Sequence, residues 1–196
     1  TFIIFPDYDD DNVANSLDSL EGNASFVNTG GIIDLIVKID GNTNLAGTFS
    51  GQHYLEFFDN QTPLLNFTHN YSVSEINLSR TSINVTDEGI VINLSGMLAT
   101  GEYKTLYLED YSYKSLCVRN AMTSSIEEIS EDCSDEGEID FTSCINSETA
   151  VNIDGVTCLD LGNLFRIGNL TYSGASGIRA APSRAVSGGG GGGYSG

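Results

Sequence analysis

Short runs of β-prone residues, separated by turn-forming clusters, recur along almost the whole chain and limit its fold more than any other feature. β-Branched and aromatic residues favour strands, whereas clusters of Gly, Asn and Asp end them. The chain is therefore predicted to be all-β. The predicted strands are 2–5, 32–39, 54–58, 64–67, 82–85, 90–94, 104–109, 115–119, 139–144, 156–161 and 164–172.

One segment, 124–132, breaks this pattern. Its serines, followed by Glu127 and Glu128, are typical of a helix N-terminus and predict a short helix. The chain changes character near 96–101, where cysteines begin to appear. We expect two small Ig-like β-sandwich domains, residues 1–98 and 99–178, with the short helix in the second. A single sandwich of about 180 residues is the alternative.

The clearest local prediction is a hairpin formed by 81–86 and 90–95. Gly89 ends the intervening loop, and a glycine there suits the left-handed conformation of a bulged turn. Alternation along the two strands places Asn84 and Asn93 on the face opposite the apolar residues.

Both asparagines belong to Asn-x-Ser/Thr sequons, which accept N-linked glycans in chains that have crossed a membrane. Six of the eight sequons fall between residues 60 and 93. We therefore predict a glycosylated protein, with Asn60 the weakest acceptor because Pro63 follows its sequon. The sequon asparagines are Asn23, Asn60, Asn66, Asn70, Asn77, Asn84, Asn93 and Asn169.

The chain has four cysteines, Cys117, Cys133, Cys144 and Cys158. No CxxC pair or nearby histidine accompanies them, so the spacing indicates two disulfides in an oxidising compartment rather than zinc ligands. Three pairings are open, with free thiols as the alternative. We favour Cys117–Cys133 and Cys144–Cys158, because each pair would close a local strand–turn unit.

The charge is strongly acidic, with 27 Asp and Glu against 8 Lys and Arg. This balance disfavours nucleic acid and anionic membranes as partners, since their binding needs clustered cations. The longest apolar run, 32–39, contains Asp34 and Lys38, so no membrane-inserting segment is predicted. From residue 179 onward the composition becomes that of a Gly-rich C-terminal tail, 179–196. The chain start, Thr1, is expected to follow a removed signal peptide.

Acidic residues near the N-terminus form one candidate metal site. Asp7, Asp9, Asp11 and Asp18 follow the oxygen-ligand spacing of a calcium loop, although Asn12 replaces its glycine and Asp18 its glutamate. A solvated acidic turn is the alternative. No other cofactor is expected.

No catalytic motif is present, and His53 and His69 are interpreted as surface or strand residues rather than bases. We therefore expect no enzyme activity; a secreted hydrolase stays the third hypothesis.

The first strand, Phe2, Ile3, Ile4 and Phe5, has two interpretations. It is either the first strand of its own domain or a strand donated to the sheet of another copy.

The order of motifs in residues 70–196 resembles that of archaeal secreted cell-surface Ig-like glycoproteins with a four-cysteine module. A weaker likeness, of architecture alone, is to archaeal surface filaments whose subunits join by donor strands. The resemblance implies a cell-surface β-sandwich glycoprotein without catalytic residues, whose relatives often continue to a membrane anchor. The motifs that carry it are Ile76-Asn-Leu-Ser, Asn93-Leu-Ser, Lys104-Thr-Leu-Tyr-Leu, Leu116-Cys-Val-Arg-Asn-Ala, Ile126-Glu-Glu-Ile-Ser-Glu-Asp-Cys, Val156-Thr-Cys and Asn169-Leu-Thr-Tyr-Ser.

The sequence thus predicts an extracellular structural subunit, linked head to tail by strand donation to other copies of itself and coated with N-linked glycans. The alternative is a surface adhesin or carbohydrate-binding module, which would use an exposed aromatic cluster such as Tyr107, Tyr111 and Tyr113.

Overall fold

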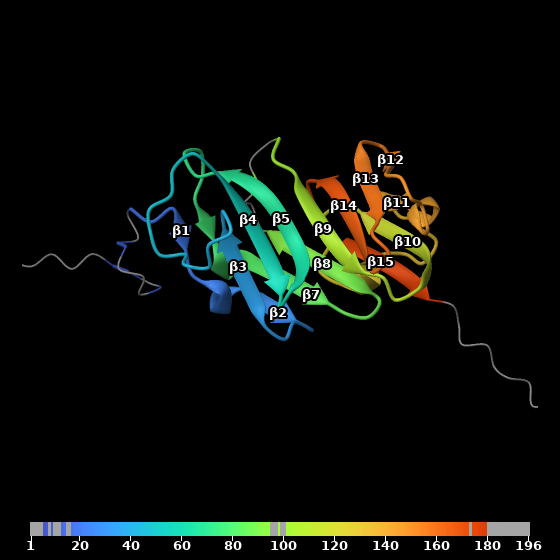
Figure 1. Cartoon of the computed structure of the whole chain (residues 1–196), viewed down its shortest axis with the longest axis horizontal. Coiled ribbons are helices and arrows are strands. Elements are labelled where there is room, and N and C mark those ends of the chain that lie inside the picture. Colours follow the sequence, from blue (N-terminus) through green and yellow to red (C-terminus); the bar gives the residue numbers. More distant parts are fainter. Residues whose placement is uncertain are drawn as a thin grey trace, which may run out of the picture.

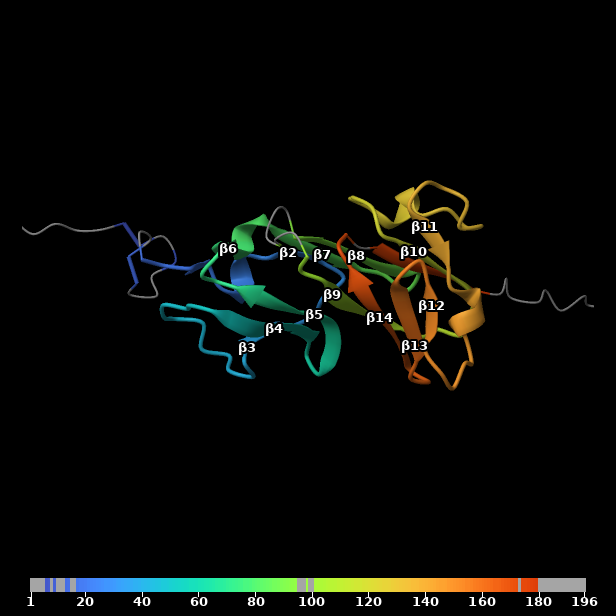
Figure 2. The same ribbon diagram turned by 90° about the horizontal axis from the view of Figure 1, so that it is seen from above.

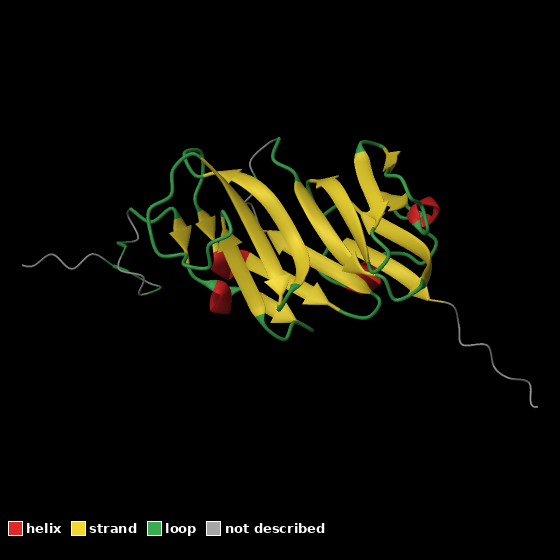
Figure 3. Ribbon diagram, viewed as in Figure 1, coloured by secondary structure: helices red, strands yellow, loops and turns green. Residues whose placement is uncertain are grey.

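The computed structural model describes residues 6, 7, 9, 13, 14, 17–94, 98, 101–172 and 174–179. Strands dominate these residues, and their helical parts are single 3₁₀ turns (Figure 3). The predicted all-β class is confirmed. No helix in the described ranges is long and apolar enough to cross a membrane. The 3₁₀ turns are η1 (Ala24–Phe26), η2 (Leu78–Arg80), η3 (Ile126–Glu128) and η4 (Thr142–Cys144).

Two sheets lie face to face and form a sandwich (Figures 1 and 2). The six-stranded sheet runs in the order β11 (Glu138–Asp140), β10 (Tyr113–Arg119), β15 (Gly174–Arg179), β8 (Gly89–Leu94), β7 (Thr81–Val85) and β2 (Asn28–Gly30). The seven-stranded sheet runs β12 (Val151–Ile153), β13 (Val156–Asp160), β14 (Leu164–Leu170), β9 (Lys104–Glu109), β5 (Thr62–Asn70), β4 (Gln52–Asp59) and β3 (Leu35–Ile39). A small parallel pair, β1 (Leu20–Glu21) and β6 (Ile76–Asn77), lies beside them.

Both sheets contain strands from both halves of the chain. In the six-stranded sheet β8 pairs with β15, and in the seven-stranded sheet β5 pairs with β9. One core of buried apolar residues extends from Leu20 to Ala175. This arrangement is the single sandwich of the alternative, not two sandwiches divided at residue 98. The division is absent because hydrogen bonding and apolar burial both continue across it.

The hairpin of β7 and β8 forms as predicted, but Gly89 has another role. Thr86 and Gly89 exchange backbone hydrogen bonds, so the loop is the two residues between them, and Gly89 has no positive φ. A Cβ at Gly89 would lie 2.3 Å from the backbone oxygen of Ala175 in β15. Glycine is needed there because β15 approaches closely, not because the turn is left-handed.

The predicted short helix at 124–132 is only the single turn η3. The residues that predicted the helix N-terminus do form local hydrogen bonds. The Glu128 carboxylate accepts from the Thr123 hydroxyl and the Ser124 backbone N–H. The next residue, Ile129, is extended and buried. Its side chain packs over Gly174, where a Cβ would lie 2.8 Å from the Ile129 Cδ1. Packing on the sheet thus ends the helix after one turn.

Candidate functional site

The two ends of the long axis of the sandwich differ in what lies beside their edge strands. At one end lie the edge strands β11 and β12, and at the other lie β2 and β3 (Figure 1). We call the first the disulfide end and the second the open end. Edge strands expose unpaired backbone groups, so the way each end is covered determines what can bind there.

The disulfide end is closed covalently. Cys144 in η4, just after β11, bonds to Cys158 in β13, and this bond connects the two sheets. The second bond, Cys117–Cys133, attaches the loop after η3 to β10. Both predicted pairings are confirmed, with Cα–Cα distances of 5.4 Å for Cys117–Cys133 and 6.0 Å for Cys144–Cys158.

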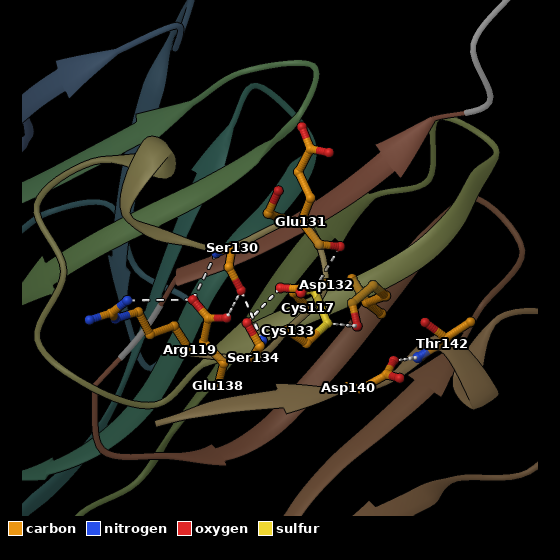
Figure 4. The surroundings of a disulfide bond; sticks show 12 residues. Cys117, Arg119, Ser130, Glu131, Asp132, Cys133, Ser134, Glu138, Asp140 and Thr142 are labelled. Atoms are coloured by element: carbon orange, nitrogen blue, oxygen red, sulfur yellow. Dashed lines mark hydrogen bonds and ion pairs between the residues drawn. A yellow bond between two sulfur atoms is a disulfide. The ribbon is translucent and has the colours of Figure 1, made fainter. Parts of the chain in front are cut away.

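Carboxylates order the loop around Cys117–Cys133 (Figure 4). The buried Glu138 side chain accepts hydrogen bonds from the Ser130 backbone N–H at 2.8 Å and the Asp135 backbone N–H at 3.2 Å, and it pairs with Arg119. Burial raises the pKa of Glu138, but these hydrogen bonds and the Arg119 charge together lower it below its ordinary value. The loop is therefore held by an ionised carboxylate.

The open end has an unpaired strand edge. The Asp34 carbonyl accepts from the Asn60 N–H, and the Asp40 N–H donates to the Tyr54 carbonyl. The even-numbered residues along β3 therefore bond to β4. Hydrogen bonds alternate along an antiparallel ladder, so the N–H and C=O groups of Leu35 and Val37 point away from the sheet. These are the groups that an added strand would use.

A groove of about 850 Å³ lies beside this edge. The residues that line it come from η1, β3 and the segment 43–46, among them Ala24, Val27, Leu35 and Leu45. Leu35, Leu45 and Ala24 are only partly buried and pack on the core. Ile33, also on the groove, is 86% exposed. An apolar groove next to open backbone groups is suited to a strand that carries apolar side chains.

The predicted donor strand, Phe2 to Phe5, lies outside the described residues, as does the tail 180–196.

All eight sequon asparagines are accessible to solvent. Asn23, Asn60 and Asn169 are exposed, and the other five are partly exposed. In the β7–β8 hairpin, Asn84 and Asn93 face away from the buried Ile83 and Ile92, as predicted. Exposure meets one requirement of glycosylation at every site.

Some sequon side chains already make protein contacts. The Nδ2 of Asn66 donates to the Tyr107 hydroxyl at 3.0 Å, and that of Asn169 donates to the Gly155 carbonyl at 3.1 Å. An amide nitrogen that carries a glycan keeps one N–H, so either bond is compatible with modification.

The candidate calcium ligands are only partly described, because Asp11 lies outside the described residues. The Asp9 carboxylate accepts the Gly22 backbone N–H at 2.6 Å, and the Asp18 carboxylate accepts that of Leu20 at 2.9 Å. Within the described residues, no three His, Cys, Asp or Glu side chains are arranged to hold a metal ion. Asp9 and Asp18 thus order backbone in this structure, and calcium binding stays a prediction.

The three tyrosines proposed as an exposed cluster are not all exposed, although the rings of Tyr111 and Tyr113 lie edge-on at 6.2 Å. Tyr113 is buried, at 4% exposure, while Tyr111 is 41% exposed. Tyr107 and Tyr111 instead line a second pocket, of about 320 Å³, together with Asp59 and Glu109. Two tyrosine rings beside carboxylates could contact the apolar faces and hydroxyl groups of a sugar.

Both histidines are strand residues, in agreement with the sequence-based interpretation, but their inward position was not predicted. His53 and His69 face the interior at the open end, and His69 is completely buried between Glu102 and the Ser74 carbonyl. Its Nε2 contacts a backbone carbonyl rather than a hydroxyl, so these residues do not form a nucleophilic triad. A signal was present, because His53 and His69 continue the alternation of Leu55 and Phe67 on their strands.

Comparison of the chain with models of known protein families, with curated proteins and with solved structures finds no match. The proposed function therefore depends on the geometry of the residues at the two ends of the sandwich.

Proposed function

We propose that this chain is a structural subunit of an extracellular filament or cell-surface layer, in which copies join head to tail by β-strand donation under a coat of N-linked glycans. The unpaired edge of β3 beside an apolar groove carries the proposal. At the opposite end of the same sandwich, a disulfide links the segment after β11 to β13, and no comparable apolar groove beside β12 enters the proposal.

The donated segment is Phe2 to Phe5 of a neighbouring copy. Its apolar residues alternate on two faces, so one pair can enter the groove while the backbone pairs with Leu35 and Val37. Residues 6–17 link this segment to the described body, and when extended they span about 40 Å. That length allows the segment to reach another copy.

Backbone pairing also suits the charge of the chain. The net charge of −19 makes copies repel one another. Hydrogen bonds between strands do not need complementary charges, and salt or divalent cations would reduce the repulsion. The two disulfides fit an oxidising compartment, which supports an extracellular location.

The test is electron microscopy and size-exclusion chromatography of the native chain and two proline variants. Leu35→Pro removes an outward N–H of β3 without touching the β4 ladder, and should abolish assembly. Asn152→Pro is the matched control, because the tight turn at Asp154–Gly155 leaves Asn152 in a non-bonded pair, with its N–H facing away from β13.

Deletion of residues 1–5 should have the same effect as Leu35→Pro. Discrete monomers of the native chain at high concentration and physiological salt would refute the proposal. Closed dimers would refute the head-to-tail arrangement. Because β1 and β3 lie at the same end of the sandwich (Figure 1), two copies that exchange strands reciprocally would form such a dimer.

The second candidate is a carbohydrate-binding module, favoured by the pocket lined by Tyr107 and Tyr111. It predicts binding on a glycan array that Tyr111→Ala abolishes. An array without any signal would remove this candidate.

A further inference from the structure

His53 and His69 form a cluster at the open end. They lie directly opposite each other on β4 and β5, and both side chains point between the sheets. Tyr71 packs edge-on against both rings, with centroid distances of 5.6 Å to His53 and 4.8 Å to His69. Phe49 completes the cluster, 5.4 Å from the ring of His53.

Each imidazole lies between a carboxylate and a backbone carbonyl. For His53, Nδ1 is 2.7 Å from the Asp40 carboxylate and Nε2 is 3.1 Å from the Ser50 carbonyl. For His69, Nδ1 is 3.1 Å from the Glu102 carboxylate and Nε2 is 2.8 Å from the Ser74 carbonyl.

At His53 this arrangement requires two N–H donors. A carbonyl only accepts, and an ionised carboxylate only accepts, so the His53 ring satisfies both neighbours only as the doubly protonated imidazolium. The Tyr54 backbone N–H and the His53 side chain lower the pKa of Asp40, so that carboxylate is ionised at neutral pH. A neutral ring would place a lone pair against one of its acceptors.

The contacts of His53 hold the outer wall of the groove. This wall is the segment 40–51, of which residues 43–46 line the groove. The ring of His53 connects Asp40, at the start of the wall, to Ser50, near its end. Between these points Phe49 is attached through the Ser19 hydroxyl, and Gly41 and Gly47 adopt positive φ with no atoms near their missing Cβ. Leu45, in the middle of the wall, packs on the core, so the wall is held there and by the contacts near its two ends.

Other ionisable groups face the same cluster. Burial raises the pKa of Tyr71, and the charges of Asp18 and Asp40 raise it further. The others are Glu102, just before β9, and the buried amine of Lys104 in β9, whose pKa burial lowers to about 8. A test must therefore separate His53 from Lys104.

We propose that His53 acts as a latch that fixes the groove wall while its imidazole is protonated and releases it as the pH rises. The latch itself concerns segment 40–51, whereas its effect on assembly rests on the proposed function. Release changes the shape of the groove into which the donated strand would insert.

Amide hydrogen exchange of the full chain between pH 5.5 and 8.5, corrected for intrinsic rates, tests the latch. The opening of 40–51 should increase as the pH rises, by at most about tenfold per pH unit for the release of one proton. His53→Gln cannot be charged and should show high exchange without this pH dependence. Tyr54→Phe, on the opposite face of the same strand, is the matched control and should behave as the native chain.

Two results would overturn the latch. One is exchange of 40–51 in the native chain that does not change with pH, a result that does not need any variant to fold. The other is a pH dependence that persists unchanged in His53→Gln, which would assign it to Lys104 or His69. Assembly is measured separately, so a pH-dependent wall in a chain that never assembles would support the latch and refute the proposed function.

Discussion

The two ends of the sandwich achieve order by different means. The disulfide end combines two covalent bonds with ionised carboxylates around Glu138, whereas the open end depends on two imidazoles and a few hydrogen bonds. Carboxylates with lowered pKa values lose their charge in acid, and imidazoles lose theirs as the pH rises. The disulfide end is therefore expected to loosen in acid, where Glu138 becomes protonated.

This difference shows which end is built to remain closed. The Cys144–Cys158 bond holds the segment after β11 to β13 whatever the pH. Among the described residues, no such bond lies beside the edge of β3.

Removal of the bond between the sheets should have a large effect on stability. Cys144→Ala combined with Cys158→Ala should lower the free energy of unfolding by about 3 kcal/mol, because the closed loop no longer restricts the unfolded chain. Amide exchange of β12 should rise as well. Urea unfolding measures the loss, and a decrease below about 1 kcal/mol would mean that noncovalent contacts alone close this end.

A buried lysine at the centre of the seven-stranded sheet, between the two ends, lowers the stability of the protein. Lys104 is buried, at 3% exposure, and burial lowers its pKa from 10.5 to about 8. Its folded pKa lies below the unfolded one, so the cost is full below pH 8 and disappears as the pH rises toward 10.5. Lys104→Met should therefore stabilise the protein by about 3 kcal/mol at pH 7.

Urea unfolding at pH 7 and pH 10 checks the Lys104 prediction, because the advantage of the methionine should shrink at the higher pH. An equal advantage at both values would show that packing, and not charge, is the cause.

Glu138 should make the disulfide end sensitive to acid. Glu138→Gln removes a charged acceptor of two backbone N–H groups and should cost about 2 kcal/mol at neutral pH. The folded pKa is below 4.5, so the native contribution is present above pH 4.5 and is lost as the pH falls through the folded value. The variant should lack this acid dependence. The exposed Glu136→Gln is the control, and the same loss in both variants would argue against a specific role.

Sequence reasoning succeeded where structure is set by near neighbours. The disulfide pairs, the β7–β8 hairpin and the outward position of Asn84 and Asn93 follow from spacing and alternation. Each of these features forms within a short stretch of chain, so local patterns contain the necessary information.

Sequence reasoning failed for features that depend on pairing between strands far apart in the sequence. The order of strands in each sheet places β8 beside β15 and β5 beside β9, and no local pattern encodes such pairings. The close approach of β15 at Gly89 and the burial of Lys104 follow from the same pairings. The open groove was missed for this reason too, because β3 becomes an edge only through the order of the whole sheet.

At the open end, loss of one hydroxyl should loosen the groove wall. The Ser19 hydroxyl donates to the Phe49 carbonyl at 3.0 Å and accepts from the Phe49 N–H at 2.8 Å. Ser19→Ala should cost about 1 kcal/mol and raise amide exchange in 43–50. The exposed Ser143→Ala at the disulfide end should change neither quantity. If Ser19→Ala leaves exchange unchanged, the other contacts of the wall are sufficient to hold it.

The smallest effect on folding stability is expected for a substitution of Lys38. This substitution separates an effect on stability from an effect on association at the open edge. The Lys38 ammonium lies 4.6 Å from the ring centre of Phe58, on the outer face of β3. An exposed contact of this kind contributes about 0.5 kcal/mol, so Lys38→Val should hardly change urea unfolding. Lysine on an edge strand opposes non-specific pairing, so the variant should self-associate at lower concentration than the native chain. Sedimentation measures this shift, and Lys114→Val, an exposed lysine in the interior strand β10, is the control. Equal association of the two variants would mean that added apolar surface, and not the free edge of β3, brings the copies together.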